Sequence, residues 1–127
     1  DWLYVGDHVR ALELVVSHGE AGQTYCIGGD AERTNLQVVR AICDRLDAIH
    51  PAESDRSEQI QFVTDRPGHD QRYAIDASTI KAKLGWSPSV SFEDGLAATL
   101  DWYLAHEDWW RPILDKSYQG ERLGLSA

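Results

Sequence analysis

The chain has 127 residues, enough for one domain that buries a core of its own. Hydrophobic residues make up 43% and charged residues 26%, an ordinary balance for a globular protein, and no apolar run approaches the ~20 residues of a membrane span. The formal net charge of −9 argues against nucleic acid or an anionic membrane as a partner.

The first part of the chain predicts a strand, a helix and a second strand. Residues 1–5 form a short β-prone apolar run, and Asp7 is placed to cap a helix that ends at Gly19. The apolar positions at helical spacing are Val9, Leu12, Val15 and Val16. Residues 22–27 then predict a strand that ends at Gly28-Gly29.

A second helix begins at a capping box, in which Thr34 and Gln37 have the Thr-x-x-Gln spacing. Its expected apolar face consists of Leu36, Val39, Ile42, Leu46 and Ile49. The helix should end near His50-Pro51, followed by a polar surface loop over 51–59 and a third strand over 60–64.

Two further helices are expected in the last third of the chain. Asp76 should cap a short one that is closed by Gly85, with Ile80 and Leu84 facing inward. Ser91 starts the final long helix, and a tail follows from His106. We therefore predict a small α/β fold with few short strands and about four helices over residues 1–127.

The most chemically informative stretch is Asp65 to Asp76, which contains a Pro67-Gly68 bend. The bend should direct Arg66 and His69 to the same side. Arg66 carries a planar fork of donors suited to two phosphate oxygens, and His69 adds one directional donor. A phosphorylated ligand is one interpretation, and a solvated loop whose arginines and aspartates pair with each other is the other.

Asn35 offers a further donor, because its amide lies at the positive end of the second helix. The alternative is that its side chain serves the helix backbone. No metal-ligand spacing joins the five histidines, and no Tyr-x-x-x-Lys, Gly-x-Ser-x-Gly or Gly-x-Gly-x-x-Gly occurs. We therefore predict no metal site, no catalytic residue and no cofactor site in this chain.

Cys26 and Cys43 are not in a Cys-x-x-Cys motif. We interpret them as buried thiols of a reducing compartment, the cytoplasm, and do not expect a disulfide.

Several strings together resemble the C-terminal part of the dTDP-glucose 4,6-dehydratase family, a branch of the extended short-chain dehydrogenases/reductases. The specific one is Asp65-Arg66-Pro67-Gly68-His69-Asp70, continued by Arg72-Tyr73-Ala74-Ile75-Asp76. Further matches are Asp1-Trp2-Leu3-Tyr4-Val5-Gly6-Asp7-His8, Thr24-Tyr25-Cys26-Ile27-Gly28-Gly29, Leu84-Gly85-Trp86-Ser87-Pro88 and Trp102-Tyr103-Leu104. The resemblance covers nearly the entire chain.

The resemblance implies a substrate-binding lobe that grips a dTDP-sugar, with the NAD-binding Rossmann half and its catalytic residues absent. By matching positions it implies that Asn35, Arg66 and His69 contact the nucleotide and its phosphates, and it suggests Tyr118 as a fourth contact. The family oxidises the sugar at C4 with NAD, eliminates water across C5–C6 and returns the hydride to C6. Its product leads to deoxysugars such as rhamnose, and the complete enzyme is a homodimer.

The chain has no methionine and opens within a hydrophobic pattern, so we expect a fragment of a longer enzyme that is inactive alone and binds no NAD. Two alternatives stay open at this point. One is a lobe of another nucleotide-sugar epimerase or decarboxylase. The other is a non-catalytic module that binds a nucleotide or a protein.

Overall fold

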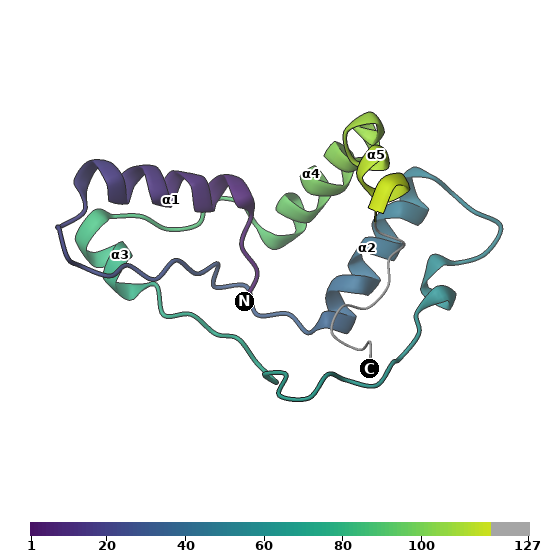
Figure 1. Ribbon diagram of the computed structural model, residues 1–127, viewed down its shortest axis with the longest axis horizontal. Coiled ribbons are helices and arrows are strands. Elements are labelled where there is room, and N and C mark those ends of the chain that lie inside the picture. Colours follow the sequence, from purple (N-terminus) through teal and green to yellow (C-terminus); the bar gives the residue numbers. More distant parts are fainter. Residues whose placement is uncertain (118–127) are drawn as a thin grey trace.

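The computed structural model describes residues 1–117 as five α-helices and one 3₁₀ helix joined by extended segments (Figure 1). The helices are α1 (Val5–His18), α2 (Asn35–Ile49), η1 (Arg56–Gln59), α3 (Ser78–Leu84), α4 (Phe92–Ala105) and α5 (Glu107–Ser117). α1 contacts α3, whereas α2 contacts η1 and α4, and α4 contacts α5. Figure 1 shows these as two groups of helices linked by long connecting segments.

The predicted α/β fold is wrong for the described residues, which contain no β-strand. The segments expected as strands at 22–27 and 60–64 form no strand, and Val5 already belongs to α1. Single hydrogen bonds join the first residues of the chain to other segments. The Trp2 backbone nitrogen donates to the Ala31 carbonyl (3.0 Å), and the Asp1 amino group donates to the Tyr73 carbonyl (2.9 Å). A strand needs a row of bonds to a neighbouring segment, and alternating apolar residues indicate extended backbone without supplying that neighbour.

Of the four apolar positions expected on the buried face of α1, Val15 packs against the core and the other three are exposed. Asp7 and Ala11 are fully buried, whereas Val9, Leu12 and Val16 are 47–88% exposed. The buried positions are four residues apart and therefore share one helix face, which packs toward α3. The exposed valines and leucine leave an apolar stripe on the other side of α1.

The buried cluster of this part of the molecule is small. Ala11, Ile80 and Trp86 form its centre, each 0–5% exposed. The inward position predicted for Ile80 is confirmed, and so is the end of α3 at Gly85, whose φ of +68° is the left-handed conformation that favours glycine. Partly buried neighbours complete the cluster, namely Leu3, Leu14, Val15, Tyr25, Ile27, Ala77 and Leu84.

Asp7 is not the helix cap that its position predicted. Tyr4 is the N-cap residue of α1, and Asp7 lies inside the first turn. The Asp7 carboxylate accepts hydrogen bonds from the Ser89 and Val90 backbone nitrogens and from the Ser89 hydroxyl, each 3.0 Å long. It also forms an ion pair with Arg10. One carboxylate therefore joins α1 to the segment that leads into α4.

The N-cap of α3 is Ala77 and not the predicted Asp76, whose carboxylate accepts from the Ser78 backbone nitrogen at 2.8 Å, whereas the boundaries of α2 and the start of α4 agree with the sequence signals. The Thr34–Gln37 capping box is present, and α2 ends at Ile49 as expected. The Ser91 hydroxyl accepts a hydrogen bond from the Asp94 backbone nitrogen and starts α4. The structure adds two elements that were not predicted: η1 within the expected loop over 51–59, and α5 within the expected tail.

The two thiols differ in exposure. Cys43 is buried, as predicted, but Cys26 is exposed, so the prediction of two buried thiols is wrong. Residues 24–27 are extended, and their alternation turns Tyr25 and Ile27 toward the core and Cys26 away from it.

No helix among residues 1–117 combines the length and apolar character needed to cross a membrane.

We predict that Asp7→Ala lowers the free energy of unfolding by about 1–3 kcal/mol, because it removes a fully buried acceptor and leaves the part-buried backbone donors of residues 89 and 90 without their partner. Urea unfolding measures the change, and Glu13→Ala on the exposed side of α1 is the control.

The pH dependence gives a second readout of the same carboxylate. Burial would raise the pKa of Asp7, but the hydrogen bonds from Val90, Ser89 and Arg10 outweigh it and hold the pKa below its ordinary value. The stabilisation is therefore present above about pH 4, the unfolded value, and is lost as pH falls through the lower folded value. Asp7→Asn should flatten this acid limb, and an unchanged limb would contradict the role assigned to Asp7.

Candidate functional site

The Pro67-Gly68 bend forms a tight turn. The His69 backbone nitrogen donates to the Arg66 carbonyl at 3.3 Å, and Gly68 has a φ of +70°. Proline at the second position and a glycine of positive φ at the third are typical of a type II turn. The predicted bend is therefore confirmed, and it lies in a fully exposed segment over residues 61–76.

Asp65 orders both ends of this turn. Its Oδ1 accepts a hydrogen bond from the Arg66 backbone nitrogen at 2.8 Å and lies 2.8 Å from Nδ1 of His69. The imidazole is thus oriented by a carboxylate, and its other nitrogen, Nε2, remains on the far side of the ring from Asp65. A turn held in this way presents the side chains of Arg66 and His69 from one rigid frame.

Arg66, Asp70 and Tyr73 meet at the Tyr73 hydroxyl. The hydrogen bond and negative charge of Asp70 raise the pKa of Tyr73, and the Arg66 guanidinium partly offsets that increase. The Arg66 guanidinium and the Asp70 carboxylate therefore both lie near this phenol.

Asn35 is the first residue of α2 and is exposed. The helix cap is made by its neighbours: the Thr34 hydroxyl accepts from the Gln37 backbone nitrogen (3.2 Å), and the Gln37 side chain accepts from the Thr34 backbone nitrogen (2.8 Å). The capping role that the alternative interpretation gave to Asn35 therefore falls to Thr34 and Gln37. Its amide stands at the positive end of the helix dipole.

Three cavities of the described part of the chain are lined by other residues, and Asn35, Arg66 and His69 line none of these three. The structure joins Arg66 and His69 through Asp65, whereas Asn35 lies on another element, at the start of α2. Tyr118, the fourth predicted residue, lies outside the described residues.

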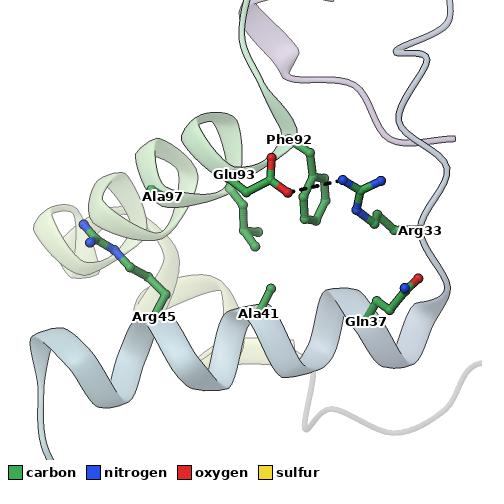
Figure 2. Close-up of a pocket in the computed structure, with 8 residues that line it drawn as sticks. Arg33, Gln37, Ala41, Arg45, Phe92, Glu93 and Ala97 are labelled. Carbon is green, nitrogen blue, oxygen red and sulfur yellow. Dashed lines mark hydrogen bonds and ion pairs between the residues drawn. The ribbon is translucent and has the colours of Figure 1, made fainter.

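Figure 2 shows the cavity between α2 and α4, with a volume of about 340 Å³. Two arginines line it, but each faces a carboxylate: Arg33 lies 3.2 Å from Glu93, and Arg45 lies 3.0 Å from Asp101. Sequence reasoning did not single out these arginines, since each pair joins residues more than 50 positions apart. Their charges are balanced, and the cavity has no excess of positive charge for an anion.

A larger cavity of about 660 Å³ lies along α4 and is lined mainly by apolar and aromatic groups, among them Trp2, Tyr4, Phe92, Trp102 and Trp109. It contains none of the phosphate-binding groups predicted from the sequence. No group of three or more His, Cys, Asp or Glu side chains within residues 1–117 is arranged to hold a metal ion.

Gly28-Gly29 does not fit a dinucleotide. A Cβ on Gly29 would lie 2.0 Å from the Trp2 carbonyl oxygen, and one on Gly28 would lie 3.0 Å from the Ile75 Cβ. These glycines therefore let three backbone segments approach one another. A pyrophosphate loop needs its glycines open to the ligand, so this pair serves packing.

The comparisons with known proteins agree with the sequence resemblance. The family model for GDP-mannose 4,6 dehydratase matches residues 1–99. The chain is 52% identical to a dTDP-glucose 4,6-dehydratase of Xanthomonas campestris, over 100% of this chain and 37% of the relative. It is 55% identical to one of Escherichia coli, over 98% of this chain and 36% of the relative.

Solved structures give the same result. A dTDP-glucose 4,6-dehydratase of Bacillus anthracis in complex with NAD is similar, with a TM-score of 0.78 and 42% identity over 89% of this chain and 33% of that one. The enzyme DesIV of Streptomyces venezuelae gives a TM-score of 0.79 at 39% identity. The chain therefore spans about a third of the length of the relatives it matches.

We predict that Thr34→Ala destabilises the chain by about 1 kcal/mol, whereas Asn35→Ala changes the free energy of unfolding by less than about 0.5 kcal/mol. The reason is that Thr34 accepts the capping bond and Asn35 does not. Thermal or urea unfolding of the two variants tests this. A larger loss from Asn35→Ala than from Thr34→Ala would restore the purely structural role of Asn35.

Proposed function

The chain belongs to the GDP-mannose 4,6 dehydratase family, and we infer that it is the substrate-binding part of a dTDP-glucose 4,6-dehydratase. The observation that carries this proposal is similarity along the whole chain, at 52–55% identity, to enzymes of that name. The family model alone is broader, because it takes its name from a different sugar nucleotide. The identity over the full length of this chain favours dTDP-glucose.

In this proposal the complete enzyme converts dTDP-glucose to dTDP-4-keto-6-deoxyglucose with bound NAD, and this chain positions the substrate. NAD is the oxidant and hydride donor when bound, and its presence in the Bacillus anthracis structure supports its use by the complete enzyme. We propose that the part of the relatives that this chain does not cover holds the cofactor, which is supported by the close packing around Gly28 and Gly29. We further propose a cytoplasmic homodimer on a route to deoxysugars such as rhamnose.

Arg66 is proposed to clamp the diphosphate, with Asn35 and His69 completing the set of donors. A guanidinium can donate two parallel hydrogen bonds to phosphate oxygens, and the dipole of α2 favours negative charge beside Asn35. The support comes from exposure and from the turn, since all three residues are exposed and Asp65 holds the frame of Arg66 and His69. Tyr118 is kept as a fourth proposed contact on the resemblance alone.

The exposed apolar surface supports the assignment to a longer enzyme. Val5, Val9 and Val16 on α1 are 56–88% exposed, and Phe62 and Val63 in an extended segment are 85% and 70% exposed. Apolar patches of this kind mark surfaces that another part of a protein covers. We propose that the remaining two thirds of a dehydratase cover them and supply partners for the extended segments.

A second candidate is a lobe that binds another nucleotide sugar, which the match to the GDP-mannose family model favours. Competition among dTDP, UDP and GDP separates the two. Tighter binding of GDP than of dTDP would favour the second candidate.

We predict that Arg66→Ala raises the KM for dTDP-glucose about 10- to 100-fold and changes kcat by less than about threefold, because it removes charge-assisted bonds to the diphosphate, which does not react. The enzyme to use is a chimera in which this chain replaces the matching third of the Xanthomonas campestris relative. Formation of the keto-sugar chromophore from dTDP-glucose gives both constants.

Two controls accompany this measurement. Arg111→Ala on α5 removes an exposed arginine that pairs with Glu107 at 2.7 Å, and it should leave both constants unchanged. The 127-residue chain alone should give no keto sugar with added NAD. A fall in kcat at unchanged KM for Arg66→Ala would contradict the binding role. Turnover by the chain alone would contradict the proposal that the catalytic residues lie in the part of the enzyme that this chain does not cover.

A further inference from the structure

The segment that carries the Arg66–His69 turn is attached to the segment that leads into α2. Arg72 Nη2 donates to Glu32 Oε2 at 2.5 Å, and the two residues are 40 positions apart in the chain. Glu32 stands three residues before Asn35, and Arg72 stands three residues after His69. This ion pair therefore joins the segment just before Asn35 to the segment just after His69, two residues that the proposed function brings to one ligand.

Neighbouring contacts hold the same two segments together on one side of the pair. The amino group of Asp1 donates to the Tyr73 carbonyl at 2.9 Å, while the Asp1 carboxylate accepts from the backbone nitrogens of Gly29 and Ala31, each at 3.2 Å. Residues 29–31 and Tyr73 are thus tied to one residue. The Glu32–Arg72 pair adds a further contact between the same two segments, nearer in sequence to Asn35 and to the turn.

Both members of the pair are exposed, Arg72 by 69% and Glu32 by 53%. Exposed ion pairs add little to global stability, so we expect this contact to affect the relative position of the two segments more than the free energy of unfolding. The hydrogen bond and charge of Arg72 lower the pKa of Glu32, so both groups are charged at neutral pH. A charged pair at 2.5 Å restricts how far the two segments can separate.

We propose that Glu32 and Arg72 are positioning residues that set the Arg66–His69 turn against the start of α2. This inference rests on the proposed function, since the position matters for binding if Asn35, Arg66 and His69 share one diphosphate. The pair itself need not touch the ligand. Its effect comes from alignment, because a displacement of about 1 Å in a positioned group can cost up to about 100-fold in activity.

The test uses the 127-residue chain and three variants, namely Glu32→Arg, Arg72→Glu and the double charge reversal. Nuclear magnetic resonance supplies two readouts for each: amide hydrogen exchange at residues 66, 68 and 69, and the Kd for dTDP from shift changes. The matched control is the exposed pair of Lys83 and Glu20, which lies 3.1 Å apart and also joins distant segments. Glu20→Lys and Lys83→Glu remove that pair in the same way.

Each single variant at 32 or 72 should speed exchange in the turn and raise the Kd about tenfold, with the melting temperature within about 2 °C of the parent. The double reversal should restore both readouts, which a simple loss of folding would not do. The control variants should change neither readout.

Unchanged exchange in both single variants, or no recovery in the double variant, would overturn the positioning role. If the parent chain shows no response to dTDP, the proposed function is contradicted, while the exchange data still decide whether the pair positions the turn. If dTDP binds the parent and the single variants equally well, the proposed function stands and the positioning role fails.

Discussion

The buried carboxylate of Asp7 is the interaction on which the arrangement of this chain most depends. It accepts three hydrogen bonds from Ser89 and Val90 and pairs with Arg10, and it is fully inaccessible. Ser89 and Val90 directly precede Ser91, which caps α4. Because α4 packs against α2, one buried charge links the first helix to the helix that carries Asn35.

The segment over residues 29–34 leads to the start of α2, where Asn35 of the proposed site lies. Asp1 holds its first residues through the backbone nitrogens of Gly29 and Ala31, and the Trp2 indole donates to the Arg33 carbonyl at 3.2 Å. The segment ends in the capping box that starts α2. We attribute substrate positioning to backbone segments that polar contacts hold in place, because the apolar cluster around Ile80 includes none of residues 29–34.

Local signals in the sequence predicted local structure well. The Thr34 capping box, the Pro67-Gly68 turn and the positive φ of Gly85 each depend on residues within a few positions, and all three are present. The strands and the burial of Asp7 depend on partners far along the chain. An apolar alternation cannot supply a missing neighbour, and the 82-residue separation of Asp7 from Ser89 leaves no local mark.

The Pro67-Gly68 turn was predictable from the motif around Arg66, whereas the diphosphate contacts of Arg66, His69 and Asn35 stay a prediction, and three cavities of the described residues do not include them. The most direct measurement is a crystal structure of the complete dehydratase chimera with dTDP bound. The account predicts diphosphate oxygens within hydrogen-bond distance of the Arg66 guanidinium and the Asn35 amide. A diphosphate bound elsewhere, with Arg66 turned toward internal carboxylates, would contradict it.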